Sequence, residues 1–133
     1  MLRAVADTHA VIWYVFGDSR LSQRAHALIE GLATAGDQVG VSPITLIEIV
    51  YLAEKGRISE ATLARVVKEL EAEDTVLVET PLNRRIAEAM QHIDRGVIPD
   101  MPDRIIAATA MSFDVPVISR DGKIRLSSVP TVW

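Results

Sequence analysis

The sequence contains no cysteine among its 133 residues. This absence excludes a disulfide framework, a thiolate zinc site and a cysteine nucleophile. The three histidines, His9, His26 and His92, are too scattered along the chain to form a spaced metal motif. A metal bound by this protein would therefore depend on oxygen ligands.

The chain also lacks any apolar run of about 18 residues, so no segment is predicted to span a membrane. The apolar stretch from Met1 to Phe16 contains Asp7 and His9 and has no small-residue cleavage site, which argues against a signal peptide. From the sequence we expect a cytoplasmic protein.

Positive charge is not in excess, because 14 Lys and Arg residues stand against 18 Asp and Glu residues, for a net charge of −4. A protein that coats nucleic acid non-specifically is usually basic, so this class is disfavoured, although a basic rim around an acidic site is compatible with the balance. No Gly-x-Gly-x-x-Gly or Walker motif follows the first predicted strand, so a Rossmann-type nucleotide protein would lack its phosphate-cradling backbone.

What the chain does contain is a regular alternation of short apolar runs and helical segments, with 49% hydrophobic and 24% charged residues. Residues 1–133 are expected to form a single domain. Strands are predicted at Leu2–Ala6, Gln38–Val41, Val76–Val78 and Val115–Ser119, with a candidate edge strand at Thr131–Trp133. The predicted helices between them are Thr8–Phe16, Ser22–Ala35, Pro43–Lys55, a segment capped by Ser59, Leu82–Ile93 and Pro102–Phe113. This order predicts an α/β fold, a three-layer α/β/α sandwich around a central, mostly parallel sheet.

Four acids stand out by their positions, and each also has an ordinary interpretation. Asp7 directly follows the first strand and is a good helix N-cap, while Asp121 follows the fourth strand and begins an Asp-Gly turn. Asp103 opens a helix, where a negative charge is favourable. Glu48 lies in a helix that is apolar nearly all round, so it needs a partner or an exposed position.

Taken together, the four acids suggest a common site, because parallel strands place their carboxyl ends at one edge of a sheet. We refer to Asp7, Glu48, Asp103 and Asp121 as the acidic quartet. At about 5 Å and an effective dielectric near 20, each pair of carboxylates repels by about 3 kcal/mol, so protons or cations must neutralise such a cluster. Oxygen ligands favour Mg²⁺ or Mn²⁺. Asp100, nearby in sequence, is interpreted as a loop or capping residue.

Four segments in order carry a resemblance to a known family. They are Val5–Ala10, Ser42–Ile49, Asp100–Ala110 and Val117–Asp121. Over nearly its whole length the chain resembles PIN-domain ribonucleases, specifically the toxins of VapBC-type toxin–antitoxin pairs. Many relatives carry Pro-Phe where this chain has Met101-Pro102, a departure that leaves the acidic positions intact.

The resemblance implies a PIN-like sandwich and a metal-dependent endoribonuclease that hydrolyses RNA phosphodiester bonds with Mg²⁺ or Mn²⁺. By position, Asp7, Asp103 and Asp121 would be metal ligands, whereas Glu48 would act through water or orient the nucleophile. The resemblance also implies a homodimer and a small cognate antitoxin. The apolar segment Val11–Phe16 is a candidate surface for self-association or for the antitoxin, and its aromatic residues are expected in the core or an interface.

Several neighbours of the quartet are candidate substrate-binding residues. Thr8 and Ser119 would place hydroxyls beside the site, and Arg104 and Arg120 would hold RNA phosphates. Lys123, Arg125, Arg84 and Arg85 are further candidates. Two alternatives stay open: a PIN-like module that binds RNA or protein without cutting, and a receiver-like or phosphatase fold with Asp7 as the nucleophile. The last leaves Glu48 and Asp103 unexplained.

Overall fold

Five short strands form one all-parallel sheet at the centre of the computed structural model, which describes all 133 residues. The strands are β1 (Leu2–Ala6), β2 (Gln38–Val41), β3 (Leu77–Glu79), β4 (Val117–Ile118) and β5 (Thr131–Val132). They lie in the order β3-β2-β1-β4-β5. The predicted α/β sandwich is therefore confirmed, including the edge strand at the end of the chain.

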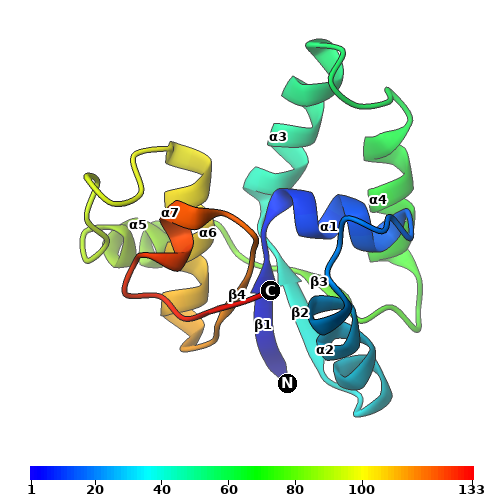
Figure 1. Cartoon of the computed structure of the whole chain (residues 1–133), viewed down its shortest axis with the longest axis horizontal. Helices are drawn as coiled ribbons and strands as arrows, with labels where there is room; N and C mark the ends of the chain where they lie inside the picture. Colours follow the sequence, from blue (N-terminus) through cyan, green and yellow to red (C-terminus); the bar gives the residue numbers. More distant parts are fainter.

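Seven helices cover the two faces of this sheet (Figure 1). They are α1 (Thr8–Val15), α2 (Gln23–Thr34), α3 (Pro43–Glu54), α4 (Thr62–Glu71), α5 (Arg84–Met90), α6 (Met101–Phe113) and α7 (Gly122–Arg125). Helices α1, α2 and α4 lie on one side of the sheet, and α5, α6 and α7 on the other. The end of α3 projects beyond the rest of the molecule beside α4.

The alternation of side chains along the strands produces two separate cores. In β1, Ala4 and Ala6 belong to the core under α1, α2 and α4, whereas Val5 belongs to the core under α5 and α6. In β4, Ile118 and Val117 divide in the same way. Because both faces are buried, these strands read as continuous apolar runs, as expected for a parallel sheet.

The boundaries of several helices follow the predicted local signals. Ser42 caps α3 through a hydrogen bond from the backbone N–H of Ile44, and Pro43 occupies the first turn. The helix ends before Gly56, whose φ of +71° is in the region that favours glycine.

Three local predictions differ from the structure. The predicted helix Leu82–Ile93 is shorter, because α5 begins after its cap Asn83. Thr80 precedes Pro81, a pattern typical of a helix start, but it donates its backbone N–H to the carbonyl of Val41 beside the sheet. Ser59 forms a turn with Ala61, and α4 begins two residues later than a cap at Ser59 implies. The predicted turn at Asp121 continues into the short helix α7.

The order of the strands positions the functional site. Since β1 lies between β2 and β4, the chain changes its direction of winding at β1, and ligands in open parallel sheets bind beyond the strand ends at such a point. Asp7 follows β1 at this edge, and Asp121 lies shortly after the end of β4. No helix of the structure is long and apolar enough to cross a membrane.

Candidate active site

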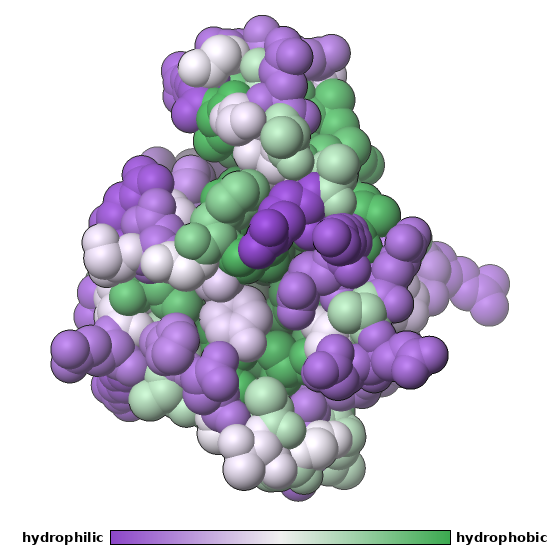
Figure 2. Space-filling view, turned by 90° about the vertical axis from the view of Figure 1, so that its right-hand side faces the viewer, coloured by the Kyte–Doolittle hydropathy of each residue, from purple (hydrophilic) through white to green (hydrophobic).

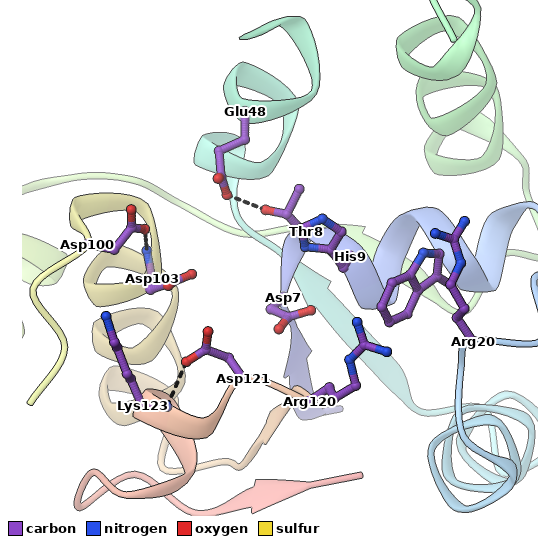
Figure 3. A pocket seen from close by; sticks show the side chains of 11 residues that line it. Asp7, Thr8, His9, Arg20, Glu48, Asp100, Asp103, Arg120, Asp121 and Lys123 are labelled. Atoms are coloured by element: carbon purple, nitrogen blue, oxygen red, sulfur yellow. Dashed lines mark hydrogen bonds between the residues drawn. The ribbon is translucent and has the colours of Figure 1, made fainter. Parts of the chain in front are cut away.

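A cavity of about 580 Å³ lies at the point where β1 and β4 end (Figure 3). Polar and charged side chains dominate its wall. The eleven lining residues are Asp7, Thr8, His9, Trp13, Arg20, Glu48, Asp100, Asp103, Arg120, Asp121 and Lys123. The structure thus brings the whole acidic quartet, from four separate parts of the sequence, to one cavity.

Asp7 combines a structural and a site position. Its Oδ1 atom accepts a hydrogen bond of 2.9 Å from the backbone N–H of Ala10, which makes it the N-cap of α1. The carboxyl group is almost fully buried. Burial raises its pKa, and hydrogen bonds from Ser119 and Ala10 oppose that rise. Asp7 therefore caps α1 and also lines the cavity.

Glu48 is held toward the cavity by a pair of threonines. The hydroxyl of Thr8 donates to Oε1 of Glu48 at 2.5 Å, and it lies 3.1 Å from the hydroxyl of the fully buried Thr45. Burial raises the pKa of Glu48, whereas the hydrogen bond from Thr8 lowers it. Thr8 therefore fixes the orientation of this carboxylate.

Asp103 is the carboxyl group on which the repulsion among the acids of the cavity is clearest. Its pKa is raised to about 7, first by burial and then by the charges of Asp100, Asp121, Glu48 and Asp7. Asp100 is the N-cap of α6 and accepts the backbone N–H of Asp103 at 3.1 Å. The predicted capping role of Asp100 is confirmed, but this residue also contributes a fifth carboxylate to the cavity wall.

Asp121 is fixed by the backbone around it. Its Oδ1 atom accepts hydrogen bonds from the N–H groups of Lys123 at 2.9 Å and Ile124 at 3.0 Å, so that it caps α7. Its own N–H donates to the hydroxyl of Ser119 at 2.9 Å. Ser119 is fully buried and supports the site from beneath instead of lining the cavity.

The residues present fit a hard divalent cation by their chemistry. The carboxylates supply only oxygen ligands, and their mutual repulsion favours a positive charge among them. No group of three or more His, Asp or Glu side chains is already arranged around one point where an ion would sit. A bound cation therefore requires rotation of side chains or bridging water to complete its ligand sphere.

The predicted basic residues separate into two groups. Arg120 and Lys123 line the cavity, but Arg104 does not. The Nη2 atom of Arg104 donates to the backbone carbonyls of Met90 and Ile93, both at 2.9 Å, and so joins α6 to the end of α5. Arg125, Arg84 and Arg85 also lie outside the cavity wall.

Sequence reasoning missed three residues that line the cavity. His9 follows Asp7 and Thr8 directly, so its proximity could have been inferred from the helix that Asp7 caps. Trp13 lies one turn further along the same helix. Arg20 comes from the loop after α1 and reaches the site only through the tertiary fold, so no local signal could have identified it.

Solved structures with a similar fold include a toxin–antitoxin complex. The VapBC2 complex of Rickettsia felis bound to a promoter DNA fragment matches with a TM-score of 0.72 and 14% identity, covering 99% of this chain and 98% of the other. A toxin–antitoxin complex from Klebsiella pneumoniae matches with a TM-score of 0.67 and 25% identity, covering 98% and 96%. FitAcB from Neisseria gonorrhoeae matches with a TM-score of 0.62 and 20% identity over the same shares.

Among curated protein sequences, no match to the chain is found. The sequence nevertheless matches the PIN domain over residues 4–129, which includes every residue of the cavity described above. This protein therefore belongs to the PIN domain family.

Proposed function

We propose that this protein is a metal-dependent endoribonuclease that hydrolyses RNA phosphodiester bonds, and that it is the toxin of a type II toxin–antitoxin pair. The observation that carries the proposal is the convergence of the acidic quartet in one cavity, where burial, together with repulsion from the neighbouring carboxylates, raises the pKa of Asp103 to about 7. Nuclease activity is general among PIN domains, so family membership supports the same chemistry.

Asp7, Asp103 and Asp121 would hold Mg²⁺ or Mn²⁺. When bound, such a cation lowers the pKa of a coordinated water and stabilises charge on phosphate oxygens. The anionic RNA backbone would otherwise be repelled by the carboxylates of the cavity, so a substrate complex without a cation is disfavoured.

Glu48 would orient the attacking water and accept its proton. Thr8 holds one carboxylate oxygen of Glu48. The other oxygen makes no hydrogen bond within the protein and is available to a water in the cavity. A fixed carboxylate with a raised pKa is better suited to accept a proton than a freely exposed one.

Arg120 and Lys123 would contact RNA phosphates at the rim of the cavity. Both side chains are exposed and neither forms an ion pair with a carboxylate of the protein. Contacts to phosphates position the substrate without reading its sequence.

An antitoxin would bind the side formed by α1, α2 and α4. Figure 2 looks at this side of the molecule and shows apolar surface between polar side chains. The predicted segment Val11–Phe16 contributes only in part, because the chain itself buries Val11, Ile12 and Trp13, while Phe16 is 47% exposed. The resemblance to toxin–antitoxin complexes supports a partner on the remaining apolar surface.

Self-association would use the exposed face of α3. Ile47, Val50 and Tyr51 lie on one face of this helix, and all three are exposed. A homodimer formed there would cover an apolar strip on the same helix as Glu48. A monomer at micromolar concentration in sedimentation analysis would contradict this part of the proposal.

The decisive experiment is cleavage of a total RNA pool with Mg²⁺, with Mn²⁺ and with EDTA. Asp103→Asn should abolish cleavage and leave the fold intact. Asp114→Asn is a matched control, because Asp114 is exposed, lies outside the cavity and has a φ of 55°, which asparagine tolerates. Cleavage by purified protein that persists in EDTA would refute metal dependence.

A PIN-like module that binds RNA or protein without cutting is the second candidate. It is favoured by one observation, namely that no three acids are arranged in advance around one ion position. RNA binding without cleavage at any concentration of Mg²⁺ or Mn²⁺ would establish this candidate over the first.

A further inference from the structure

We propose that Arg20 and Arg120, both stacked on Trp13, form a separate phosphate subsite in the cavity, for an RNA phosphate next to the one that is cleaved. The proposal rests on the nuclease function above and adds a second anchoring point for the substrate. We refer to Arg20, Arg120 and Trp13 as the arginine clamp.

Trp13 holds two guanidinium groups at the cavity. The central carbon of Arg120 lies 4.7 Å from the centroid of the Trp13 ring, and that of Arg20 lies 5.2 Å from it. Both distances are within the range of a cation–π contact. Trp13 itself is only 4% exposed, so its ring is anchored in the core and is not available for stacking with a base. The aromatic side chain therefore positions the two arginines.

Arg20 has a second constraint that fixes its orientation. Its Nη2 and Nε atoms donate to the two carboxylate oxygens of Asp18 at 2.7 and 3.1 Å. This pairing lowers the pKa of Asp18 to about 2, so it persists across the ordinary pH range. Asp18 engages one edge of the guanidinium, and the Nη1 atom stays free to donate to an anion.

Arg120 is exposed and pairs with no carboxylate, although five carboxylates line the same cavity. In Figure 3, Arg120 and Arg20 lie on the opposite side of Asp7 from Asp100 and Asp103. Stacking on Trp13 gives the guanidinium a favourable contact without an ion pair, which leaves its charge uncompensated.

The cavity therefore has an acidic part and a basic part that do not neutralise each other. Such an arrangement fits a ligand that binds through a cation at the acidic part and places a negative charge at the basic part. The cleaved phosphate must lie with the metal at the acidic part, so a neighbouring phosphate of the same RNA strand fits the arginine clamp. Guanidinium groups suit this role because they bind phosphate through charge-assisted, often paired hydrogen bonds.

Binding of RNA can be tested apart from cleavage. In an Asp103→Asn background, the affinity for a fluorescein-labelled pool of short random-sequence RNA is measured by anisotropy over a range of KCl concentrations. Arg20→Gln and Arg120→Gln should each weaken binding about tenfold and reduce the salt slope by about 0.7, as for loss of one phosphate contact on a single strand.

Arg65→Gln is the matched control. Arg65 is also an exposed arginine stacked on an aromatic ring, that of Phe16 at 5.8 Å, but it lies outside the cavity. It should leave both the affinity and the salt slope unchanged. If the two clamp variants behave like Arg65→Gln, the proposal is overturned.

A spectroscopic measurement reports on the clamp itself. The chain has two tryptophans, so Trp133→Phe leaves Trp13 as the only one. Its emission should change when the RNA pool is added, and the change should be lost after Arg20→Gln and Arg120→Gln are combined; emission that RNA does not alter would refute binding at the clamp. Cleavage by the wild-type protein is measured separately. If the clamp variants bind RNA more weakly but the wild-type protein does not cleave it, the subsite stands and the nuclease function is rejected. If the wild-type protein cleaves RNA but the clamp variants bind it as tightly as before, the nuclease function stands and the subsite is rejected.

Discussion

Replacing Asp103 by asparagine should make the metal-free protein more stable at alkaline pH. Burial and four neighbouring carboxylates disfavour the charge of Asp103 and raise its pKa from the usual 3.8 to about 7 in the fold. Below about pH 4 the group is protonated in both the folded and the unfolded chain, and no penalty exists. As the pH rises to about 7, the unfolded chain ionises first, so the fold loses stability.

The magnitude follows from the shift of the pKa. A difference of about three units corresponds to about 4 kcal/mol at full effect. The side chain is only half buried, and solvent screens part of the repulsion, so we expect a gain of about 1–2 kcal/mol for Asp103→Asn above pH 7.5. For a domain of this size the corresponding rise in Tm is about 3–8 °C.

Thermal unfolding at pH 5 and pH 8 in EDTA measures this effect. The increase in Tm of Asp103→Asn over wild type should be larger at pH 8 than at pH 5, whereas Asp114→Asn should cause the same small change at both. Adding Mg²⁺ at pH 8 should raise the Tm of the wild-type protein more than that of Asp103→Asn. An equal Tm difference at the two pH values would refute the reasoning that repulsion among the carboxylates destabilises the metal-free site.

Three further predictions concern other residues. Thr8→Val should reduce kcat of RNA cleavage about tenfold with little change in KM, because it releases the carboxylate of Glu48; an unchanged kcat would contradict a positioning role for Thr8. Arg104→Met should lower the free energy of unfolding in urea by about 1–3 kcal/mol, because two carbonyls lose their donor, and the affinity for RNA should not change. Gly40→Ala should destabilise the fold by more than about 1 kcal/mol, because the added Cβ would lie 2.7 Å from Thr80 Cγ2, and a wild-type Tm would disprove the clash.

The fold could be predicted from the sequence because its signals are local and repeated. The apolar runs and capping residues such as Ser42 identify the elements, and their alternation leads to a parallel sheet. Asp7 and Asp121 could then be placed together, since they follow β1 and β4 at the same edge of the sheet. The start of α5 is harder to predict from the sequence. Thr80 precedes a proline and resembles a helix cap, but its backbone N–H bonds to Val41 of the neighbouring strand β2.

The basic residues of the site are harder to predict from the sequence than the acidic ones. Arg104 follows Asp103 directly, but successive residues of a helix point about 100° apart, so a neighbour in sequence faces elsewhere. Residues three apart share a helix face, which is why Asp100 lies in the cavity with Asp103. Arg20 depends on how the loop after α1 folds back against Trp13, and that depends on tertiary contacts alone.

Three of the cavity acids also hold helices in place, which affects how the site can be dissected. Asp7, Asp100 and Asp121 cap α1, α6 and α7, so their removal would disturb the elements that carry the other site residues. Asparagine caps a helix about as well as aspartate, whereas alanine loses about 1 kcal/mol at such a position. Replacement by asparagine therefore removes the charge and keeps the cap, and a comparison of asparagine with alanine at Asp121 separates the contribution to chemistry from the contribution to folding.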